Sequence, residues 1–173
     1  MNFFQNEKTI YFAKMNEKAI IPTKLRENAG YDFYACLDED IFVIDPFTTR
    51  LVPTGIAWAS SEDYYMQIEE RSSTGTKGIK RNAGVIDSGY RGEIKIAIYN
   101  ANNKPLIFSS LDENQIRERL PQMQDFLLYT TQKAIAQGVI HRVEDMVPTE
   151  VDLETLLSIP STRGDKGWGS SGK

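Results

Sequence analysis

The chain has 173 residues, enough for one domain with a buried core, and its 20 Lys and Arg against 24 Asp and Glu give a net charge of −4. A mildly acidic chain is not expected to bind nucleic acid through a broad cationic face. Its hydrophobic content of 40% excludes a disordered chain, and its one cysteine, Cys36, excludes an internal disulfide and a multi-cysteine zinc site.

Neither a membrane span nor a secretory signal is predicted. No apolar run approaches the roughly 20 residues that cross a bilayer. Residues 1–7 lack a basic cluster followed by a long apolar stretch. We therefore expect a soluble cytoplasmic protein that does not contact membranes.

Short apolar segments separated by turn residues predict an all-β fold. The pattern is clearest from Glu93 to Tyr99, where Ile94, Ile96 and Ile98 alternate with the intervening residues, the period of a half-buried strand. Similar segments occupy residues 9–13, 41–44, 51–53, 56–59, 64–68, 126–129 and 139–140. Many short strands in close succession favour a sandwich, a jelly roll or a barrel.

One segment predicts a short helix instead. Ser110 and Glu113 have the spacing of a capping box, in which each side chain binds a backbone amide of the other residue. The apolar residues at 111, 116 and 120 lie on roughly one helical face, and a proline follows them. We expect this helix to cover residues 111–120.

Three segments carry groups that suit a polyphosphate. Residues 71–75 combine a guanidinium with hydroxyls, and the alternative is a solvated turn. Residues 82–93 place glycines around the carboxylate of Asp87 and the ring of Tyr90, where the carboxylate could act as a general base; the alternative is a polar turn with a salt bridge. Residues 163–173 supply glycine amides for anions and Trp168 for stacking on a base. Together they predict a nucleotide polyphosphate, with Mg²⁺ held mainly by the phosphates and water.

Two other reactive residue types are given structural interpretations. His141 lies in an alternating segment and is interpreted as a surface residue, so neither a His-rich metal site nor a Ser-His-Asp triad is expected. Cys36 is interpreted as a small core residue.

Five ordered motifs resemble those of the trimeric dUTP nucleotidohydrolases (dUTPases). Residues 29–35 are similar to the first motif, A-G-x-D-L-x-A, and Arg71-Ser72-Ser73 to the second, with Lys77 at the spacing that the family uses. Residues 84–93 resemble the third and most specific motif, 135–137 the core of the fourth, and 163–172 the fifth.

The resemblance implies a dUTPase-like jelly roll or β-barrel that assembles as a homotrimer and hydrolyses dUTP to dUMP and pyrophosphate with Mg²⁺. By motif position, Asp87 would activate the water that attacks the α-phosphorus, and Asp32 would hold the metal through water. Tyr90 would pack on the deoxyribose, and Trp168 would lie over the base. Phosphates would be bound by Arg71, Ser72, Ser73, Gln137, Arg163, Ser170 and Ser171. Uracil recognition and the rest of the substrate site would fall to Asn82, Gly84, Val85, Ile86, Lys95, Gly167 and Gly169.

The resemblance also divides the chain. Residues 1–159 are expected to form the β domain, and residues 160–173 a flexible arm that closes over the site of a neighbouring subunit. The 44 positions from Glu93 to Gln137 exceed the family pattern, which predicts an insertion at about 105–124 around the expected helix. This insertion is either a decorative surface loop or an element that binds a protein partner.

Two departures from the motifs are visible. Trp168 stands where the family usually has Phe, which preserves stacking but changes the shape of the arm. Residues 132–134 read Gln-Lys-Ala where the fourth motif normally reads Gly-Asp-Arg.

Two alternative functions remain at this point. The dCTP deaminases share the fold and the phosphate site, but usually carry an Arg three residues after the Arg-Ser-Ser run, where this chain has Thr76. They also lack the Tyr-Arg-Gly-Glu sequence found at 90–93. The second alternative is a regulatory module that binds dUTP and acts on a protein partner through the insertion.

Overall fold

The computed structural model of the chain describes residues 8–165. The chain divides into two compact units, one over residues 1–143 and one over residues 144–173. Among the described residues, no helix is both long enough and apolar enough to cross a membrane.

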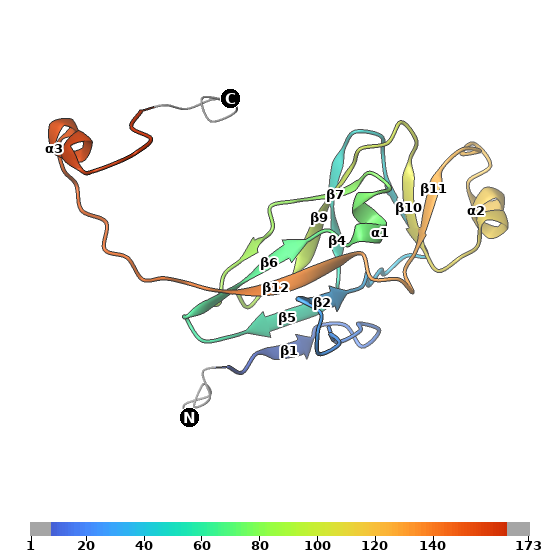
Figure 1. The fold of residues 1–173 in the computed structure, drawn as a ribbon. Coiled ribbons are helices and arrows are strands. Elements are labelled where there is room, and N and C mark those ends of the chain that lie inside the picture. Colours follow the sequence, from blue (N-terminus) through green and yellow to red (C-terminus); the bar gives the residue numbers. More distant parts are fainter. Residues whose placement is uncertain (1–7, 166–173) are drawn as a thin grey trace. The chain divides into compact units, whose positions relative to one another are not determined.

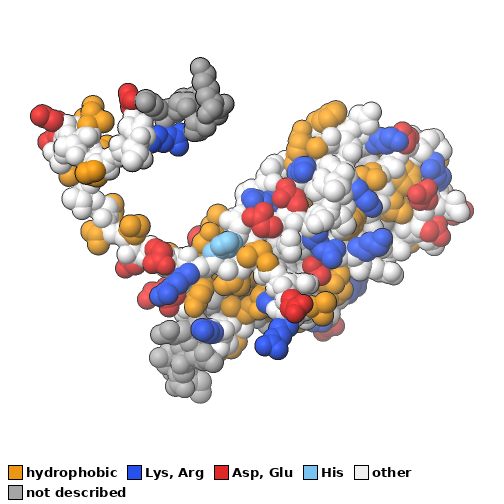
Figure 2. All heavy atoms as spheres, in the orientation of Figure 1, with side chains coloured by type: hydrophobic (Ala, Val, Ile, Leu, Met, Phe, Trp, Pro, Cys, Tyr) orange, Lys and Arg blue, Asp and Glu red, His pale blue; other side chains and the backbone are white. Residues whose placement is uncertain are grey.

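The first unit consists mainly of short β-strands, as the all-β expectation requires (Figure 1). In chain order they are β1 (Tyr11–Lys14), β2 (Gly30–Phe33), β3 (Ile41–Ile44), β4 (Thr49–Pro53), β5 (Ile56–Ala59), β6 (Tyr64–Glu69), β7 (Ile79–Asn82), β8 (Val85–Ile86), β9 (Lys95–Asn100), β10 (Leu106–Ser109), β11 (Leu127–Thr130) and β12 (Ala136–Arg142). On the face seen in Figure 2, acidic and basic side chains of this unit are interspersed.

The strands form four small sheets. Their orders are β1-β5, β11-β10-β3, β2-β12-β6-β8 and β4-β9-β7. All pairs are antiparallel except β10 with β11, which are parallel and joined through a helix. The long-range pairing of β12 with both β2 and β6 holds together segments more than 60 residues apart in the sequence.

The core confirms the alternation seen in the sequence in part. Ile94, Ile96 and Ile98 are all buried and Lys95 is exposed, but Ala97, on the face with Lys95, is buried too. Phe33, Trp58 and other large apolar side chains complete the same cluster. Each such side chain contributes about 1.5–3 kcal/mol when it is removed from water, so this cluster is the main source of stability in the unit.

A one-turn helix, α1 (Ser72–Gly75), follows β6, where the sequence left a solvated turn as the alternative to a phosphate-binding segment. The buried hydroxyl of Thr74 accepts a hydrogen bond from the Arg71 amide at 3.1 Å and donates one to the Arg71 carbonyl at 2.9 Å. This side chain therefore closes the turn, a local effect that the polar composition did not indicate.

The helix expected at 111–120 is confirmed as α2 (Glu113–Arg119), but its cap differs from the prediction. The capping box joins Asp112 and Gln115, whose reciprocal hydrogen bonds measure 2.9 and 3.0 Å, in place of Ser110 and Glu113. Ile116 is fully buried and fixes the helix against the unit.

The segment predicted as an insertion, 105–124, has two distinct parts. Its first part is β10, which pairs with β3 and β11 and whose Leu106, Ile107 and Phe108 are fully buried. Its second part holds α2 and exposed flanking residues, beside β10 and β11 in Figure 1. Only the second part can therefore vary without loss of the core.

The second unit contains a helix that the sequence reading did not anticipate, α3 (Leu153–Ser158). The Asp152 carboxylate accepts a hydrogen bond from the Thr155 amide at 2.6 Å, and this bond lowers the pKa of Asp152. The second unit begins at Glu144, upstream of the expected boundary at 159, and the arm assigned to 160–173 stays a prediction.

Candidate active site

Three of the expected site residues, Asp32, Arg71 and Gln137, meet in the β2-β12-β6-β8 sheet where β6 ends and β12 begins. Asp32 in β2 lies opposite Gln137 in β12, and Gln137 lies opposite Glu69 at the end of β6. The Arg71 Nε is 3.1 Å from Asp32 Oδ1, and Gln137 Nε2 donates to the Glu70 carbonyl at 3.0 Å. The strand pairing thus places a carboxylate, a guanidinium and an amide side by side.

Neighbouring groups fix this arrangement. The Arg71 Nη1 donates to the carbonyl of Ala134 at 3.2 Å, which holds the guanidinium against the turn before β12. A Cβ added to Gly30 would lie 2.9 Å from the Cβ of Gln137, so the glycine leaves the space that the Gln137 side chain occupies. Ser72 and Ser73 follow Arg71 in α1 and are exposed.

The segment that carries Asn82, Gly84, Val85 and Ile86 connects β7 in one sheet to β8 in another. Ala83 adopts a left-handed conformation, with φ of 49°, and the Gly84 carbonyl accepts a hydrogen bond from the Ile68 amide at 2.7 Å. A Cβ on Gly84 would lie 2.6 Å from Gln67 Nε2 and 2.7 Å from Arg81 Nη1. The backbone of this segment therefore lies directly against β6 and the Arg81 guanidinium.

A second group of expected site residues lines an open pocket of about 300 Å³. Its lining residues are Leu51, Val85, Ile86, Asp87, Tyr90, Glu93, Ile94 and Lys95. The Tyr90 hydroxyl donates to the Glu93 carbonyl at 3.0 Å, while its ring covers Gly92. A carboxylate, an ammonium and a flat aromatic ring thus surround one space large enough for a small ligand.

The two groups lie apart within one chain. Met66 pairs with Ile86, so the next residue, Asp87, lies at the level of Tyr65 in β6, whereas Gln137 pairs with Glu69. These levels are four residues apart along β6, about 13 Å, and β8 and β12 flank β6 on opposite sides, about 10 Å apart. Asp32, on β2, is one strand farther from Asp87.

The remaining expected residues belong to the second unit. The Arg163 amide is bonded to the Ser161 hydroxyl at 3.2 Å. Gly167, Trp168, Gly169, Ser170 and Ser171 lie outside the described residues.

The residues interpreted as structural behave as expected. His141 is exposed on β12 and stacks on Tyr65, with ring centroids 5.3 Å apart. Cys36 is buried in the core, and burial, followed by the nearby charges of Asp38 and Glu93, raises the pKa of its thiol.

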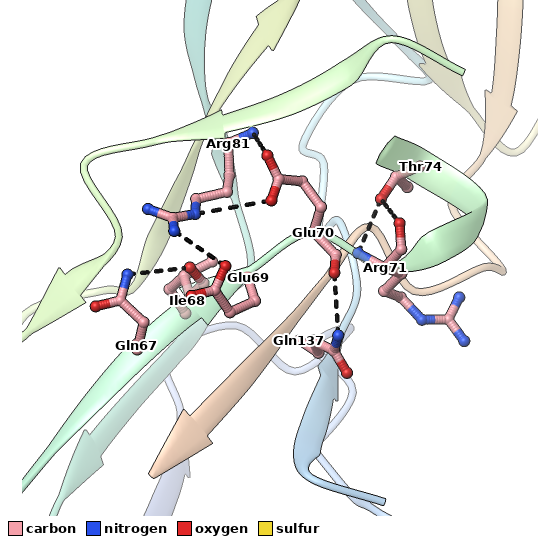
Figure 3. A network of polar contacts seen from close by, with 8 residues as sticks. All are labelled: Gln67, Ile68, Glu69, Glu70, Arg71, Thr74, Arg81 and Gln137. Atoms are coloured by element: carbon pink, nitrogen blue, oxygen red, sulfur yellow. Dashed lines mark hydrogen bonds and ion pairs between the residues drawn. The ribbon is translucent and has the colours of Figure 1, made fainter. Parts of the chain in front are cut away.

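Sequence reasoning missed a polar network next to Asp32, Arg71 and Gln137, which together are called the Arg71 cluster. Figure 3 shows Glu69 and Glu70, at and just after the end of β6, both turned toward Arg81 of β7. Two adjacent glutamates directly before the Arg-Ser-Ser run were a visible signal. Their partner was not, because it comes from a different sheet.

Comparison with known proteins decides the family. A dUTPase family profile matches residues 16–112. The deoxyuridine 5'-triphosphate nucleotidohydrolase of Neisseria meningitidis serogroup B is 34% identical over 158 residues, 88% of each chain. That of Nautilia profundicola is 32% identical over 164 residues, 92% of this chain and 96% of its own. The chain belongs to the dUTPase family.

Solved dUTPase structures agree with the fold. The Staphylococcus bacteriophage 80alpha dUTPase with dUPNHPP superposes with a TM-score of 0.73 at 22% identity, covering 96% of this chain and 99% of its own. The EIAV dUTPase superposes with a TM-score of 0.59 at 19% identity, covering 84% of this chain and 98% of its own. The expected dUTPase-like β fold and the classification as a dUTP diphosphatase are confirmed, whereas the mechanism and the residue roles stay predictions.

Proposed function

We propose that this dUTPase hydrolyses dUTP to dUMP and pyrophosphate through attack of water on the α-phosphorus, with Asp87 as the general base. The observation that carries the proposal is the pocket in which Asp87, Tyr90 and Lys95 converge. The choice of dUTP as the substrate is based on the relatives, which are named deoxyuridine 5'-triphosphate nucleotidohydrolase. Cleavage of a phosphoanhydride needs a positioned water, a base and charge neutralisation, and no protein nucleophile.

The nucleoside half of dUTP belongs in this pocket. The Tyr90 ring, held by its bond to the Glu93 carbonyl, packs on the deoxyribose and leaves little room for a 2′-hydroxyl. The segment from Asn82 to Ile86 reads the uracil edge through backbone groups, which its tight packing against β6 keeps in place. Lys95 lines the same space and is paired with Glu93 at 3.5 Å.

The triphosphate half belongs with the Arg71 cluster. A guanidinium donates several charge-assisted hydrogen bonds to phosphate oxygens, and the hydroxyls of Ser72 and Ser73 and the amide of Gln137 add neutral donors. Arg163 and the arm residues Gly167, Trp168, Gly169, Ser170 and Ser171 would complete the site when the arm closes and excludes water.

The residues of this chain fit Mg²⁺ bound mainly by substrate. The described residues contain no group of three or more His, Cys, Asp or Glu able to form a cage, and Asp32, with 30% of its side chain exposed, is accessible to a hydrated ion. Mg²⁺ commonly uses one or two carboxylates together with waters and substrate phosphates. When bound, the ion neutralises phosphate charge as it develops.

We infer that the complete site forms between copies in a homotrimer. A base and a metal-holding carboxylate that act at one α-phosphate must both approach it closely, yet the register keeps Asp87 and Asp32 of one chain far apart. The apolar side chains of Leu51, Val85 and Tyr90 are exposed around the pocket, as expected of a surface that another copy covers.

The test of the substrate compares dUTP with dCTP. We expect pyrophosphate and dUMP from dUTP and no ammonia from dCTP. Ammonia released from dCTP, without pyrophosphate from dUTP, would favour the related dCTP deaminase reaction.

A regulatory role through a protein partner and a cytoplasmic location stay predictions. Glu113, Asn114 and Glu118 of α2 are exposed, so replacing them by alanine tests the partner hypothesis without removing β10. Unchanged turnover together with loss of a purified partner's binding would support an interaction element.

A further inference from the structure

Two carboxylates stand directly before the residues assigned to phosphate binding. Glu69 ends β6, Glu70 follows it, and Arg71 comes next. A triphosphate approaching Arg71 would meet two more negative charges within one or two residues of its binding group. Unless these charges are neutralised, they raise the free energy of the bound polyanion.

Both carboxylates are bound by one residue, Arg81 of β7. The Arg81 Nη2 is 2.9 Å from Glu69 Oε2, and its Nε is 4.0 Å from Glu70 Oε2. The Arg81 amide also donates to Glu70 Oε1 at 3.3 Å. Figure 3 shows the Glu70 carboxylate pointing toward β7 while the Arg71 guanidinium points away on the other side.

The same contacts fix the backbone on which the phosphate-binding groups depend. The Glu70 carbonyl accepts the hydrogen bond of Gln137 Nε2, and the Glu70 side chain is held by Arg81. The Arg81 side chain is 26% exposed, so water screens these pairs only in part. Because Arg81 lies in β7 and its partner Glu69 in β6, which belong to different sheets, this cluster also joins two sheets next to the site.

We propose that Arg81 is a positioning residue for the triphosphate: it neutralises Glu69 and Glu70 and turns them away from Arg71. The proposal deepens the proposed function and rests on it. Arg81 makes no contact with substrate in this scheme and acts through the two glutamates. Its Nη1 also lies beside Gly84, a contact that Arg81→Gln and the triple variant described below lose equally.

The test compares Arg81→Gln with a triple variant, Glu69→Gln/Glu70→Gln/Arg81→Gln, and measures kcat and KM for dUTP at low and high salt. For Arg81→Gln we expect KM to rise about tenfold at low salt and less at high salt, because the exposed carboxylates repel phosphate. The kcat should stay within about threefold, since this repulsion acts on bound substrate and transition state alike. The triple variant should restore KM to within about threefold of wild type.

A purely structural role gives a different result, because the ion pairs are lost in both variants. A triple variant as impaired as Arg81→Gln, or a KM for Arg81→Gln within twofold of wild type, would overturn the proposal. Arg119→Gln is the matched control. It removes an arginine at the end of α2 that is paired with Asp40, and it should leave KM unchanged.

Two further measurements separate the possible failures. If Arg81→Gln does not fold, the double variant Glu69→Gln/Glu70→Gln is the deciding test. Its KM for dUTP should be no higher than that of wild type. A KM at least threefold higher than that of wild type would contradict the proposal. Binding of inorganic triphosphate with Mg²⁺ is measured by calorimetry on all variants. If wild type cleaves no dUTP but triphosphate affinities follow the expected order, the hydrolase proposal fails and the Arg81 proposal stands.

Discussion

The guanidinium of Arg71 is paired with the carboxylate of Asp32 at 3.1 Å, which joins α1 to β2 at the edge of a sheet. Both side chains are about one-third exposed, at 33% and 30%. A pair with this exposure contributes at most about 1 kcal/mol to stability. The pair therefore fixes the position of Arg71 with little gain in stability.

Asp32→Asn should separate these two effects. We expect the melting temperature to change little, while kcat/KM for dUTP falls by about 10- to 100-fold and more Mg²⁺ is needed for half-maximal rate, because in the proposed site Asp32 orients Arg71 and would hold the ion through water. The measurement is a Mg²⁺ titration of turnover. Asp125→Asn, which breaks the exposed pair with Lys104, is the control; an equal loss in both variants would contradict the role of Asp32.

Asp87→Asn tests the general base. The amide has nearly the shape of the carboxylate but cannot accept the proton of water, so turnover should fall by about 10²–10⁴-fold while dUTP still binds. Single-turnover kinetics and a binding titration check both halves. Asp63→Asn, at the loop between β5 and β6, should retain full activity. Near-normal turnover of Asp87→Asn would remove Asp87 from the mechanism.

Mixing inactive variants tests the shared site. If Asp87 of one copy acts with Arg71 of another, coexpressed Asp87→Asn and Arg71→Ala chains form mixed trimers in which about a quarter of the sites have both native halves. We expect such mixtures to regain activity that neither variant has alone. Absence of recovery, in mixtures proved to be mixed by mass spectrometry, would show that each site is built within one chain.

The sequence predicted local features well and long-range features poorly. The buried isoleucines of β9 follow from alternation alone, and the helix at α2 follows from the spacing of its apolar residues. The cap of α2 was assigned wrongly because two overlapping pairs have the same spacing. The structure resolves the choice through the reciprocal hydrogen bonds of Asp112 and Gln115.

Recognition of the site residues depended on motifs, and their arrangement depended on strand register. Asp32 and Gln137 are more than 100 residues apart in the sequence and become neighbours only through the pairing of β2 with β12. The separation of Asp87 from them follows from the pairing of β6 with β8. Neither register can be read from local composition, because each is fixed by burial across several strands.

The buried thiol of Cys36 predicts a pH effect on stability. Its pKa is raised in the folded state, chiefly by burial, so above the usual thiol range the unfolded chain loses this proton before the folded one. Stability should then fall as pH rises past that range, more in wild type than in Cys36→Ala. Urea unfolding of both proteins at a series of alkaline pH values measures the difference.

In the native protein, alkylation of the Cys36 thiol should also be slow; rapid alkylation at neutral pH would contradict its burial.

Ile116 is the buried residue of α2 and packs the helix against the unit. Ile116→Ala should lower the free energy of unfolding by about 2–5 kcal/mol, through lost burial and the cavity that remains. Arg117→Ala, on the same helix, loses an exposed pair with Glu113, a hydrogen bond to the Gln124 carbonyl and the contact with the Phe126 ring, and should cost about 1 kcal/mol. Urea unfolding at one fixed protein concentration compares them, since oligomerisation makes stability depend on concentration. Equal midpoints for the two variants would mean that α2 is held by its surface charges and that the Ile116 side chain adds no anchoring of its own.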